Sequence, residues 1–428
     1  MNDEGRDYRN KKVAVIGLAH SGIAAACLLK ELGAEVFITD SACNEKVTAL
    51  AEDLHRQGIA AEIGGHSLDS IRNKDLVVVS PGVSAASPAL KWANELGIPV
   101  ISEIELAWSL CPATIIAITG TNGKTTVTTL VAKVLEAAGK KAVALGNIGK
   151  PFSREVMNLG KDDFVSLEVS SFQLETIRAF KPKVSVILNF TPDHLDRYKD
   201  IQEYLSAKKR IFMNQDENDY TVLNYDDLAL RALAGCTKAK TVFFSAKGSA
   251  DDIKRKRALN PNHFAVMAVA KIFNIPETIC DEVFRNFKGV EHRMELVRTF
   301  KKIDFINDSK ATNVDSTMWA LRNTYKPAIL IAGGRDKNSD YAVIFELMRQ
   351  KVKLLVVIGE ARGKILKALG GCVPMQEASS LEEAVALGFE KAKSGDCVLL
   401  SPMCASFDMF ENYEHRGKVF KEIVNKLK

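Results

Sequence analysis

The segment Gly120-Thr-Asn-Gly123-Lys124-Thr125 contains the residue types that bind the phosphate groups of a nucleotide. A glycine-rich turn between a strand and a helix directs backbone N–H groups and the positive helix end toward phosphate. Lys124 can reach the terminal phosphates, and Thr125 can offer its hydroxyl group to Mg²⁺. The loop is a shortened variant of the common pattern, whose first glycine would fall at Ile118. We therefore predict phosphate binding by Gly120, Thr121, Asn122, Gly123, Lys124, Thr125 and Thr126.

Acidic and imidazole groups follow two further apolar runs. Glu168 ends one run, and Asp193-His194 comes shortly after the next. Side chains at the carboxyl ends of neighbouring parallel strands face the ligand crevice of an open sheet. Oxygen ligands such as Glu168 suit Mg²⁺. Taken by itself, His194 also fits a packed or helix-capping histidine.

Near the start of the chain, Gly17 to Gly22 resembles a dinucleotide-binding turn, with Ala19 in place of the middle glycine. Asp40 ends the next apolar run and could bind ribose hydroxyl groups. From these residues alone, NAD, another nucleotide and no ligand at all remain open.

Three polar clusters lie in the last third of the chain, at 307–313, 333–337 and 401–408. Each of the first two combines a lysine with several hydrogen-bonding groups, although a solvated turn or helix cap would look the same. In the third cluster, Cys404 has no evident partner base, so we do not predict a thiol nucleophile.

The elements that must position these residues follow a repeated order of strand, glycine turn and helix. Apolar strands that alternate with amphipathic helices predict parallel sheets with helices on both faces. Helices are expected at Ser21–Leu32, at 125–138 and from about Gly417 to Lys428. The main expected strands are 13–16, 36–38, 76–79, 114–118, 164–169, 184–188, 329–331, 354–358 and 398–400.

Composition places the chain among ordinary globular proteins. It has 428 residues, 46% of them hydrophobic and 26% charged, with a formal net charge of +5. That length predicts about three domains, and we place them at 1–110, 111–297 and 298–428. The small net charge does not indicate nucleic-acid binding. The eight cysteines show no C-x-x-C pair, and no apolar run could span a bilayer, so we expect a reduced, cytoplasmic protein without membrane insertion.

Together, these motifs resemble those of the Mur ligases of bacterial cell-wall synthesis. The similarity covers nearly the whole chain. It includes the short phosphate loop, Gly146–Gly149, Leu167–Leu174, Asp193–Arg197 and Glu291–Arg293. The pairing of Ser80-Pro-Gly82 with the stretch Ser401–Gly417 is similar to the members that add D-glutamate to UDP-N-acetylmuramoyl-L-alanine.

The resemblance implies a Rossmann-like first domain, a P-loop ATPase-like middle domain and a Rossmann-like third domain. It also implies an ATP- and Mg²⁺-dependent ligase that acts through an acyl phosphate, as a cytoplasmic monomer with ATP, D-glutamate and the UDP-linked substrate as its partners. Catalytic roles would fall on Lys124, Glu168, His194 and Lys208, with Lys208 rather than Lys209 carbamylated. The metal would be held by Thr125, Glu168, His194 and Lys208.

The same resemblance assigns the remaining ligand contacts. Arg293 and Asp308 would contact ATP. The UDP-linked substrate would meet Ser21, Asp40, Ser41, Gly82, Asn147 and Ser170, and D-glutamate would meet Lys310, Thr312, Lys337, Ser406 and Phe407. A His-Asn pair that is common before the Ala-rich helix is absent from Leu259–Ala268, which leaves an adenine contact from Asn260 or Asn262 open.

Three other functions fit parts of the pattern. A folylpolyglutamate-synthase-like ligase would begin at the phosphate-loop domain, and here a full domain precedes that loop. A regulator without catalysis would not need Lys124, Glu168, His194 and Lys208 together. A dehydrogenase would leave the phosphate loop unused.

Overall fold

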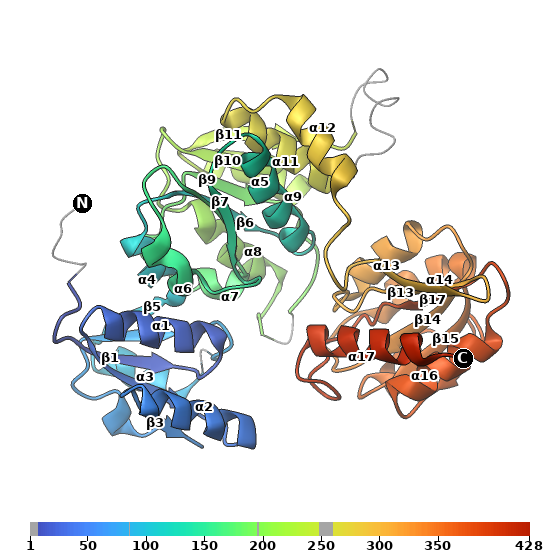
Figure 1. The fold of residues 1–428 in the computed structure, drawn as a ribbon, viewed down its shortest axis with the longest axis horizontal. Helices are drawn as coiled ribbons and strands as arrows, with labels where there is room; N and C mark the ends of the chain where they lie inside the picture. The colour runs from blue at the N-terminus through green and yellow to red at the C-terminus, as the bar shows by residue number, and fades with distance from the viewer. Residues whose placement is uncertain (1–6, 85, 195–196, 248–259) are drawn as a thin grey trace. The chain divides into compact units, whose positions relative to one another are not determined.

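The computed structural model describes residues 7–84, 86–194, 197–247 and 260–428. Residues 1–6, 195–196 and 259, which belong to segments discussed above, lie outside the described residues. Contacts divide the chain into two compact units (Figure 1). The first comprises Met1–Phe190 with Gln202–Asn286, and the second comprises Thr191–Ile201 with Phe287–Lys428.

The first unit begins with a five-stranded parallel sheet of order β3-β2-β1-β4-β5. Val13 and Val15 of its central strand pack in one apolar cluster with Leu29, whereas Ala14 and Ile16 pack in another with Ala93. The strand is therefore covered on both faces, as its unbroken apolar sequence predicts. Its elements are β1 (Lys12–Ile16), α1 (His20–Glu31), β2 (Glu35–Asp40), α2 (Glu45–Arg56), β3 (Ala60–Ile63), β4 (Leu76–Val79), α3 (Pro88–Glu95), β5 (Val100–Ser102) and α4 (Glu103–Leu110).

The same unit contains a six-stranded parallel sheet of order β11-β10-β9-β6-β8-β7. Ile115 and Ala117 of its strand β6 join a core cluster with Phe152 and Phe180. The elements are β6 (Thr114–Thr119), α5 (Lys124–Ala137), β7 (Ala142–Gly146), α6 (Phe152–Glu155), β8 (Phe164–Glu168), α7 (Ser171–Leu174), β9 (Val184–Ile187), α8 (Ile201–Lys209), β10 (Tyr220–Asn224), α9 (Leu228–Ala232), β11 (Lys240–Phe244), α11 (Pro261–Ile272) and α12 (Glu277–Asn286).

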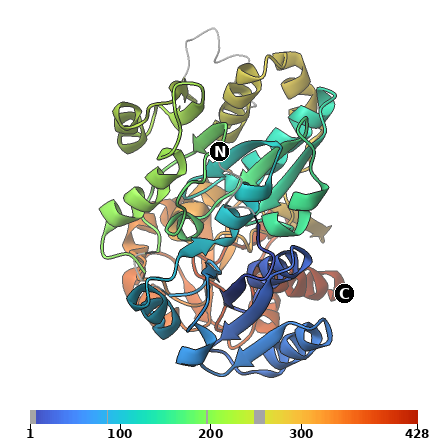
Figure 2. The same cartoon turned by 90° about the vertical axis from the view of Figure 1, so that its left-hand side faces the viewer.

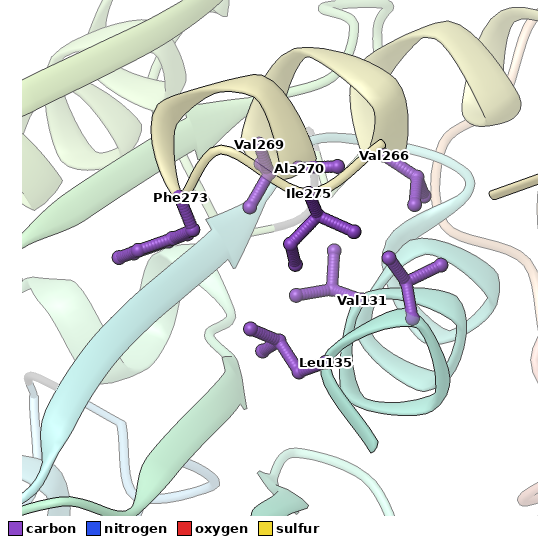
Figure 3. Close-up of a pocket in the computed structure, with 8 residues that line it drawn as sticks. Val131, Leu135, Val266, Val269, Ala270, Phe273 and Ile275 are labelled. Atoms are coloured by element: carbon purple, nitrogen blue, oxygen red, sulfur yellow. The ribbon is translucent and has the colours of Figure 1, made fainter. Parts of the chain in front are cut away.

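An apolar pocket lies between α5 and α11 (Figure 3). The figure shows side chains of the two helices pointing toward one another across it. Because every lining side chain is a hydrocarbon, the pocket offers no partner for a phosphate group, and we interpret it as a packing seam. The lining residues are Val131, Val134, Leu135, Val266, Val269, Ala270, Phe273 and Ile275.

The second unit contains a six-stranded sheet of order β12-β13-β17-β14-β15-β16. Only the β12–β13 pair of this sheet is antiparallel. Figure 1 shows its strands flanked by helices, and Figure 2 shows the strands and helices of the first sheet, coloured blue, from a second side. The elements are β12 (Glu295–Phe300), β13 (Ile303–Asn307), α13 (Val314–Arg322), β14 (Ala328–Gly333), α14 (Phe345–Lys351), β15 (Val352–Ile358), α15 (Arg362–Ala368), β16 (Met375–Glu377), α16 (Leu381–Lys391), β17 (Cys397–Leu400) and α17 (Tyr413–Lys426).

The predicted α/β architecture with parallel sheets is confirmed, and every strand expected from the sequence is present. The last helix begins at Tyr413 rather than near Gly417, because the Asn412 side chain accepts a hydrogen bond from the His415 backbone N–H and caps it there. The longer segment of the second unit begins at Phe287, whereas the third domain was predicted to begin at residue 298. Within the described ranges, no helix is both long enough and apolar enough to cross a membrane.

Candidate active site

The predicted phosphate loop lies between β6 and α5. Gly120 and Gly123 have φ angles of 148° and 84°, in the range that favours glycine. A Cβ atom on Gly120 would also lie 3.0 Å from the Cβ of Leu188. The sequence between these two elements therefore needs glycine at both positions to form this turn.

Asn189, which follows β9, holds the phosphate loop from the side. Its backbone carbonyl accepts a hydrogen bond from Thr121 N (3.1 Å). Its side chain accepts one from Asn122 N (2.8 Å) and donates one to Asn122 O (2.9 Å). No role for Asn189 follows from the sequence alone, because only the pairing of β9 with β6 reveals its position.

Lys124 folds back over the loop. Its Nζ donates hydrogen bonds to the carbonyl oxygens of Gly120 and Thr121, each at 2.9 Å. The ammonium group is thus held at the mouth of the loop, where it could exchange a carbonyl partner for a phosphate oxygen.

Among the described residues, the buried oxygen atoms without a hydrogen-bond partner include Thr125 Oγ1 and Glu168 Oε2. The other carboxylate oxygen of Glu168 accepts a hydrogen bond from Asn147 Nδ2 (3.0 Å). A buried carboxylate oxygen without a partner is costly unless a cation or donor meets it. Hydroxyl and carboxylate oxygens are ligands that Mg²⁺ prefers, so this pair fits a magnesium ion.

Lys208 lies on α8, and only 1% of it is exposed. Its Nζ donates a hydrogen bond to Gly120 O (3.0 Å) and lies 4.3 Å from the centre of the Tyr204 ring. The neighbouring Lys209 is more exposed. The structure therefore brings Lys208 to the phosphate loop beside Lys124, Thr125 and Glu168, all in the first unit.

His194 belongs to the segment Thr191–Ile201, which is part of the second unit. Its φ angle is 58°, which is uncommon for a residue with a side chain. Its backbone N–H donates to the carboxylate of Asp193 (2.9 Å). The structure thus does not place His194 in the same unit as the other predicted metal ligands.

In the first sheet, the predicted substrate residues follow β1, β2 and β4. The carboxylate of Asp40 accepts hydrogen bonds from Leu18 N (2.6 Å) and Ala42 N (2.8 Å), so it joins the two turns. Gly22 packs so tightly that a Cβ atom would lie 1.9 Å from Gly17 O. Ser21, Ser41 and Gly82 lie in the same turns or at the start of α1, and all are at least partly exposed.

Two further predicted substrate residues adjoin Glu168. Asn147 bonds its carboxylate, as described above. Ser170 caps the short helix α7 in a reciprocal arrangement with Gln173, so its side chain already has a structural role.

Asp308 is fully buried at the end of β13. Its carboxylate accepts hydrogen bonds from Ser401 Oγ (2.9 Å) and Met294 N (3.2 Å), and Arg293 Nη1 lies 3.9 Å away. Burial raises the pKa of Asp308 to about 6 despite these partners. The predicted pair Arg293 and Asp308 is therefore brought together.

The predicted D-glutamate residues come from loops that follow three adjacent strands, β13, β17 and β14. Lys310 Nζ donates to the hydroxyl of Tyr413 (2.8 Å), and Lys337 Nζ lies 3.4 Å from the Asp193 carboxylate. Thr312 is half-buried and Ser406 is buried, whereas 63% of Phe407 is exposed.

Arg416 ties two of these loops together, although the sequence analysis gave it no role. It is 1% exposed and donates to Ser309 O (2.8 Å) and Ser309 Oγ (3.0 Å). It also donates to Cys404 O (3.3 Å) and Ala405 O (3.4 Å). Burial lowers the pKa of Arg416 to about 10, so it remains charged at neutral pH.

Among the described residues, one cluster of three His, Cys, Asp or Glu side chains lies close enough together to hold a metal ion, namely Glu291, His292 and Glu295. Lys421 Nζ bonds both carboxylates, at 3.0 and 2.6 Å. The group already contains its cation, so we do not assign it a metal.

Comparisons with known proteins find similar sequences along nearly the whole chain. Residues 11–102 match the Mur ligase MurD-like N-terminal domain, 118–289 the Mur ligase middle domain, and 292–404 the Mur ligase glutamate ligase domain. UDP-N-acetylmuramoylalanine–D-glutamate ligases of Chloroherpeton thalassium and Koribacter versatilis are each 41% identical to the chain. Each alignment covers 98% of the chain, with 99% and 98% of the respective relative.

Solved structures share the fold at lower identity. The UDP-N-acetylmuramate–alanine ligase MurC of Thermotoga maritima is 20% identical, with a TM-score of 0.62 over 98% of this chain and 100% of its own. The MurF ligase of Thermotoga maritima, solved in complex with ADP, is 14% identical, with a TM-score of 0.62 over the full length of both chains. The full-length relatives and the three domain matches show that the chain belongs to the Mur ligase family.

Proposed function

We propose that the chain is an ATP-dependent ligase that joins D-glutamate to UDP-N-acetylmuramoyl-L-alanine, with ADP and phosphate as the other products. It would act in the synthesis of peptidoglycan precursors. The observation that carries this proposal is the 41% identity, over 98% of the chain, with relatives that bear this activity in their names. The phosphate loop and the cationic clusters of the second unit supply groups suited to such anionic ligands.

The chemistry proceeds in two steps. The γ-phosphoryl group of ATP moves to the terminal carboxylate of the L-alanyl group, which gives an acyl phosphate and ADP. The amine of D-glutamate then attacks the acyl carbon, so a C–N bond forms, the C–O bond to phosphate breaks, and the amine loses a proton. Phosphoryl transfer depends mainly on positioning and charge neutralisation, which Lys124 and the backbone N–H groups of residues 120–126 would provide.

Mg²⁺ would neutralise charge on the phosphate oxygens when it is bound. The buried, unpartnered oxygens of Thr125 and Glu168 support a site for it. We assign His194 and a carbamylated Lys208 as the further ligands. Burial disfavours the ammonium form of a lysine, and the neutral amine is the form that combines with carbon dioxide, releasing a proton as the carbamate forms.

Each sheet would serve one substrate. The turns after the first sheet, with Ser21, Asp40, Ser41 and Gly82, would bind the UDP group, and Asn147 with Ser170 the muramoyl-peptide arm. The middle sheet, 111–297, would bind ATP, together with Arg293 and Asp308. The third sheet would bind D-glutamate through Lys310, Thr312, Lys337, Ser406 and Phe407.

The first sheet favours this function over a folylpolyglutamate-synthase-like ligase. The FolC protein of Escherichia coli has a TM-score of 0.57 with this chain, over 80% of the chain and 99% of its own length. Residues 11–102, in contrast, match the MurD-like N-terminal domain. A domain dedicated to the UDP group is what the proposed substrate requires.

We further propose that the enzyme works as a monomer in the cytoplasm, without nucleic-acid partners. All eight cysteines are free, which suits a reducing compartment. Sedimentation of the purified protein would test the monomer.

The test is phosphate release with ATP, Mg²⁺, UDP-N-acetylmuramoyl-L-alanine and a panel of amino acids. We expect release with D-glutamate and only background release with L-lysine or diaminopimelate. Release with either of the latter but not with D-glutamate would contradict the proposal. The Lys124→Ala variant serves as the inactive control.

A further inference from the structure

Asp193 and Lys337 form an ion pair that is almost completely removed from water. Lys337 Nζ lies 3.4 Å from Asp193 Oδ1, and the exposed fractions of the two side chains are 12% and 7%. Lys337 follows strand β14, and Asp193 lies in the segment Thr191–Ile201. Both belong to the second unit, so the pair is a feature of that unit alone.

Asn313 fixes the other oxygen of Asp193. The Asn313 side chain caps α13 by accepting a hydrogen bond from Ser316 N (2.9 Å), which requires its oxygen to point toward the helix. Its Nδ2 group must then point away, and it donates to Asp193 Oδ2 (2.9 Å). The carboxylate of Asp193 is therefore held by an ammonium on one side and an amide on the other.

These partners form a receptor for a carboxylate, and in this structure the carboxylate comes from the protein itself. In the proposed function, Lys337 binds the side-chain carboxylate of D-glutamate. The pair of Asp193 and Lys337 is neutral overall. A second carboxylate would give this nearly dehydrated group a net negative charge, which is strongly unfavourable.

We propose that Asp193 is an internal placeholder for the substrate, which occupies Lys337 until the side-chain carboxylate of D-glutamate displaces it. This inference rests on the proposed function, because it takes D-glutamate as the ligand of Lys337. Any ligand that must displace an internal competitor binds with an apparent affinity reduced by the fraction of protein in the competent state. Asp193 thus sets the D-glutamate concentration at which the enzyme works.

Displacement of Asp193 from Lys337 would also affect the neighbouring residue His194. The His194 backbone N–H donates to Asp193 Oδ1 (2.9 Å), the same oxygen that faces Lys337. With a φ angle of 58°, His194 is held in a conformation that is uncommon for its residue type. Movement of the Asp193 carboxylate would weaken this hydrogen bond to the His194 backbone, so binding of the amino acid changes the freedom of a proposed metal ligand.

The test compares the KM for D-glutamate in the full-length enzyme and three variants, at saturating ATP and UDP-linked substrate. Asp193→Asn removes the charge but keeps an oxygen that can accept from Asn313. We expect it to lower the KM for D-glutamate by on the order of fivefold, because the competitor for Lys337 is lost. Lys337→Met should raise this KM.

Asp315→Asn is the matched control. Asp315 accepts a hydrogen bond from Thr191 Oγ1 (3.4 Å) in the same segment as Asp193. Its substitution loosens this segment without changing the charge beside Lys337. The KM for D-glutamate should then stay within about twofold of wild type, because the carboxylate that pairs with Lys337 is unchanged.

A competitor without the side-chain charge gives a second readout. The inhibition constant of D-glutamine should be the same for wild type and Asp193→Asn, because its amide does not compete for the ammonium as a carboxylate does. KM and inhibition constants do not depend on the fraction of folded enzyme, so partial misfolding of a variant leaves them interpretable.

The outcomes separate this inference from the proposed function. A wild-type enzyme that does not use D-glutamate contradicts both. Alternatively, the enzyme uses D-glutamate, but Asp193→Asn raises the KM for D-glutamate or leaves it unchanged. In that case Asp193 orients Lys337 or does not compete for it, so the placeholder proposal is wrong and the proposed ligase function still stands. An unchanged KM in Lys337→Met likewise overturns the placeholder only.

Discussion

At the scale of single residues, burial changes the charge properties of the groups in the site. Lys208 and Arg416 are each 1% exposed, and Asp308 is fully buried. The buried guanidinium of Arg416 donates hydrogen bonds to Ser309, Cys404 and Ala405, which replace its hydration. A charged group can remain in such a place only when partners replace its hydration, so Lys208 and Asp308 each give a testable prediction.

We expect Lys208→Arg to lose most activity, by roughly a hundredfold, because replacing residues that support a metal site commonly lowers activity by up to that factor. Arginine keeps a positive charge but cannot form a carbamate. The matched control is Lys209→Arg, which changes the more exposed neighbour and should stay active. The rate of phosphate release by both purified variants measures this effect. A fully active Lys208→Arg enzyme would show that catalysis needs no carbamate on Lys208.

Asp308 should make folding stability depend on pH. Burial raises its pKa from 3.8 to about 6 in the folded protein, so the folded state holds the proton more tightly than the unfolded state. The stabilisation is complete below about pH 4 and is lost as pH rises through 6, with a total of about 3 kcal/mol. Urea unfolding of wild type and Asp308→Asn between pH 4 and 8 measures this difference. If the free energy of unfolding of wild type and of Asp308→Asn changed with pH in the same way, the raised pKa of Asp308 would be wrong.

At the scale of elements, the site depends on turns that bring the backbone very close to itself. Gly17 and Gly22 in the first sheet, and Gly120 and Gly123 in the middle sheet, lie where a strand turns into a helix. In each case the space for a Cβ atom is taken by another part of the chain. The helix can therefore begin at the ligand edge only when these positions lack a side chain.

Gly22→Ala should destabilise the protein by about 3 kcal/mol, within the range for overpacked or strained positions. The added Cβ atom would lie 1.9 Å from Gly17 O, so α1 must shift away from the turn. Gly363→Ala on α15 is the matched control, because its Cβ atom would meet nothing within 4 Å. That change should stabilise the helix by up to about 1 kcal/mol. Equal midpoints of urea unfolding for the two variants would show that the close approach of residue 22 to Gly17 O does not limit stability.

At the scale of the whole molecule, two buried carboxylates of α4 join the first two sheets into one unit. Glu105 accepts hydrogen bonds from the backbone N–H groups of residues 178–180, at 3.0, 2.7 and 2.9 Å. Glu103 accepts one from Ser153 N (2.6 Å). These contacts explain why the first two predicted domains fall in a single compact unit, while the third sheet forms its own.

Local sequence predicted the phosphate loop and about half of the strands that the structure describes, because their signals lie within a few neighbouring residues. The glycine spacing at 120–123 and the apolar runs on either side sufficed for that. Arg416 could not be predicted in this way, since it acts on Ser309, a residue 107 positions earlier in the chain. The antiparallel strand β12 was missed for a related reason, because its half-exposed residues lack a continuous apolar run.

In the proposed reaction, the substrate carboxylate is activated as an acyl phosphate and then captured by D-glutamate. UDP-N-acetylmuramoyl-L-alanine labelled with ¹⁸O in both oxygens of its terminal carboxylate tests this most directly, with mass spectrometry of the phosphate released in the presence of ATP, Mg²⁺ and D-glutamate. We expect each phosphate to carry a single ¹⁸O atom, and the product to gain one D-glutamyl residue while it keeps only one of the two ¹⁸O atoms of the labelled carboxylate. Phosphate without the label, or labelled phosphate formed equally well with L-glutamate, would contradict it.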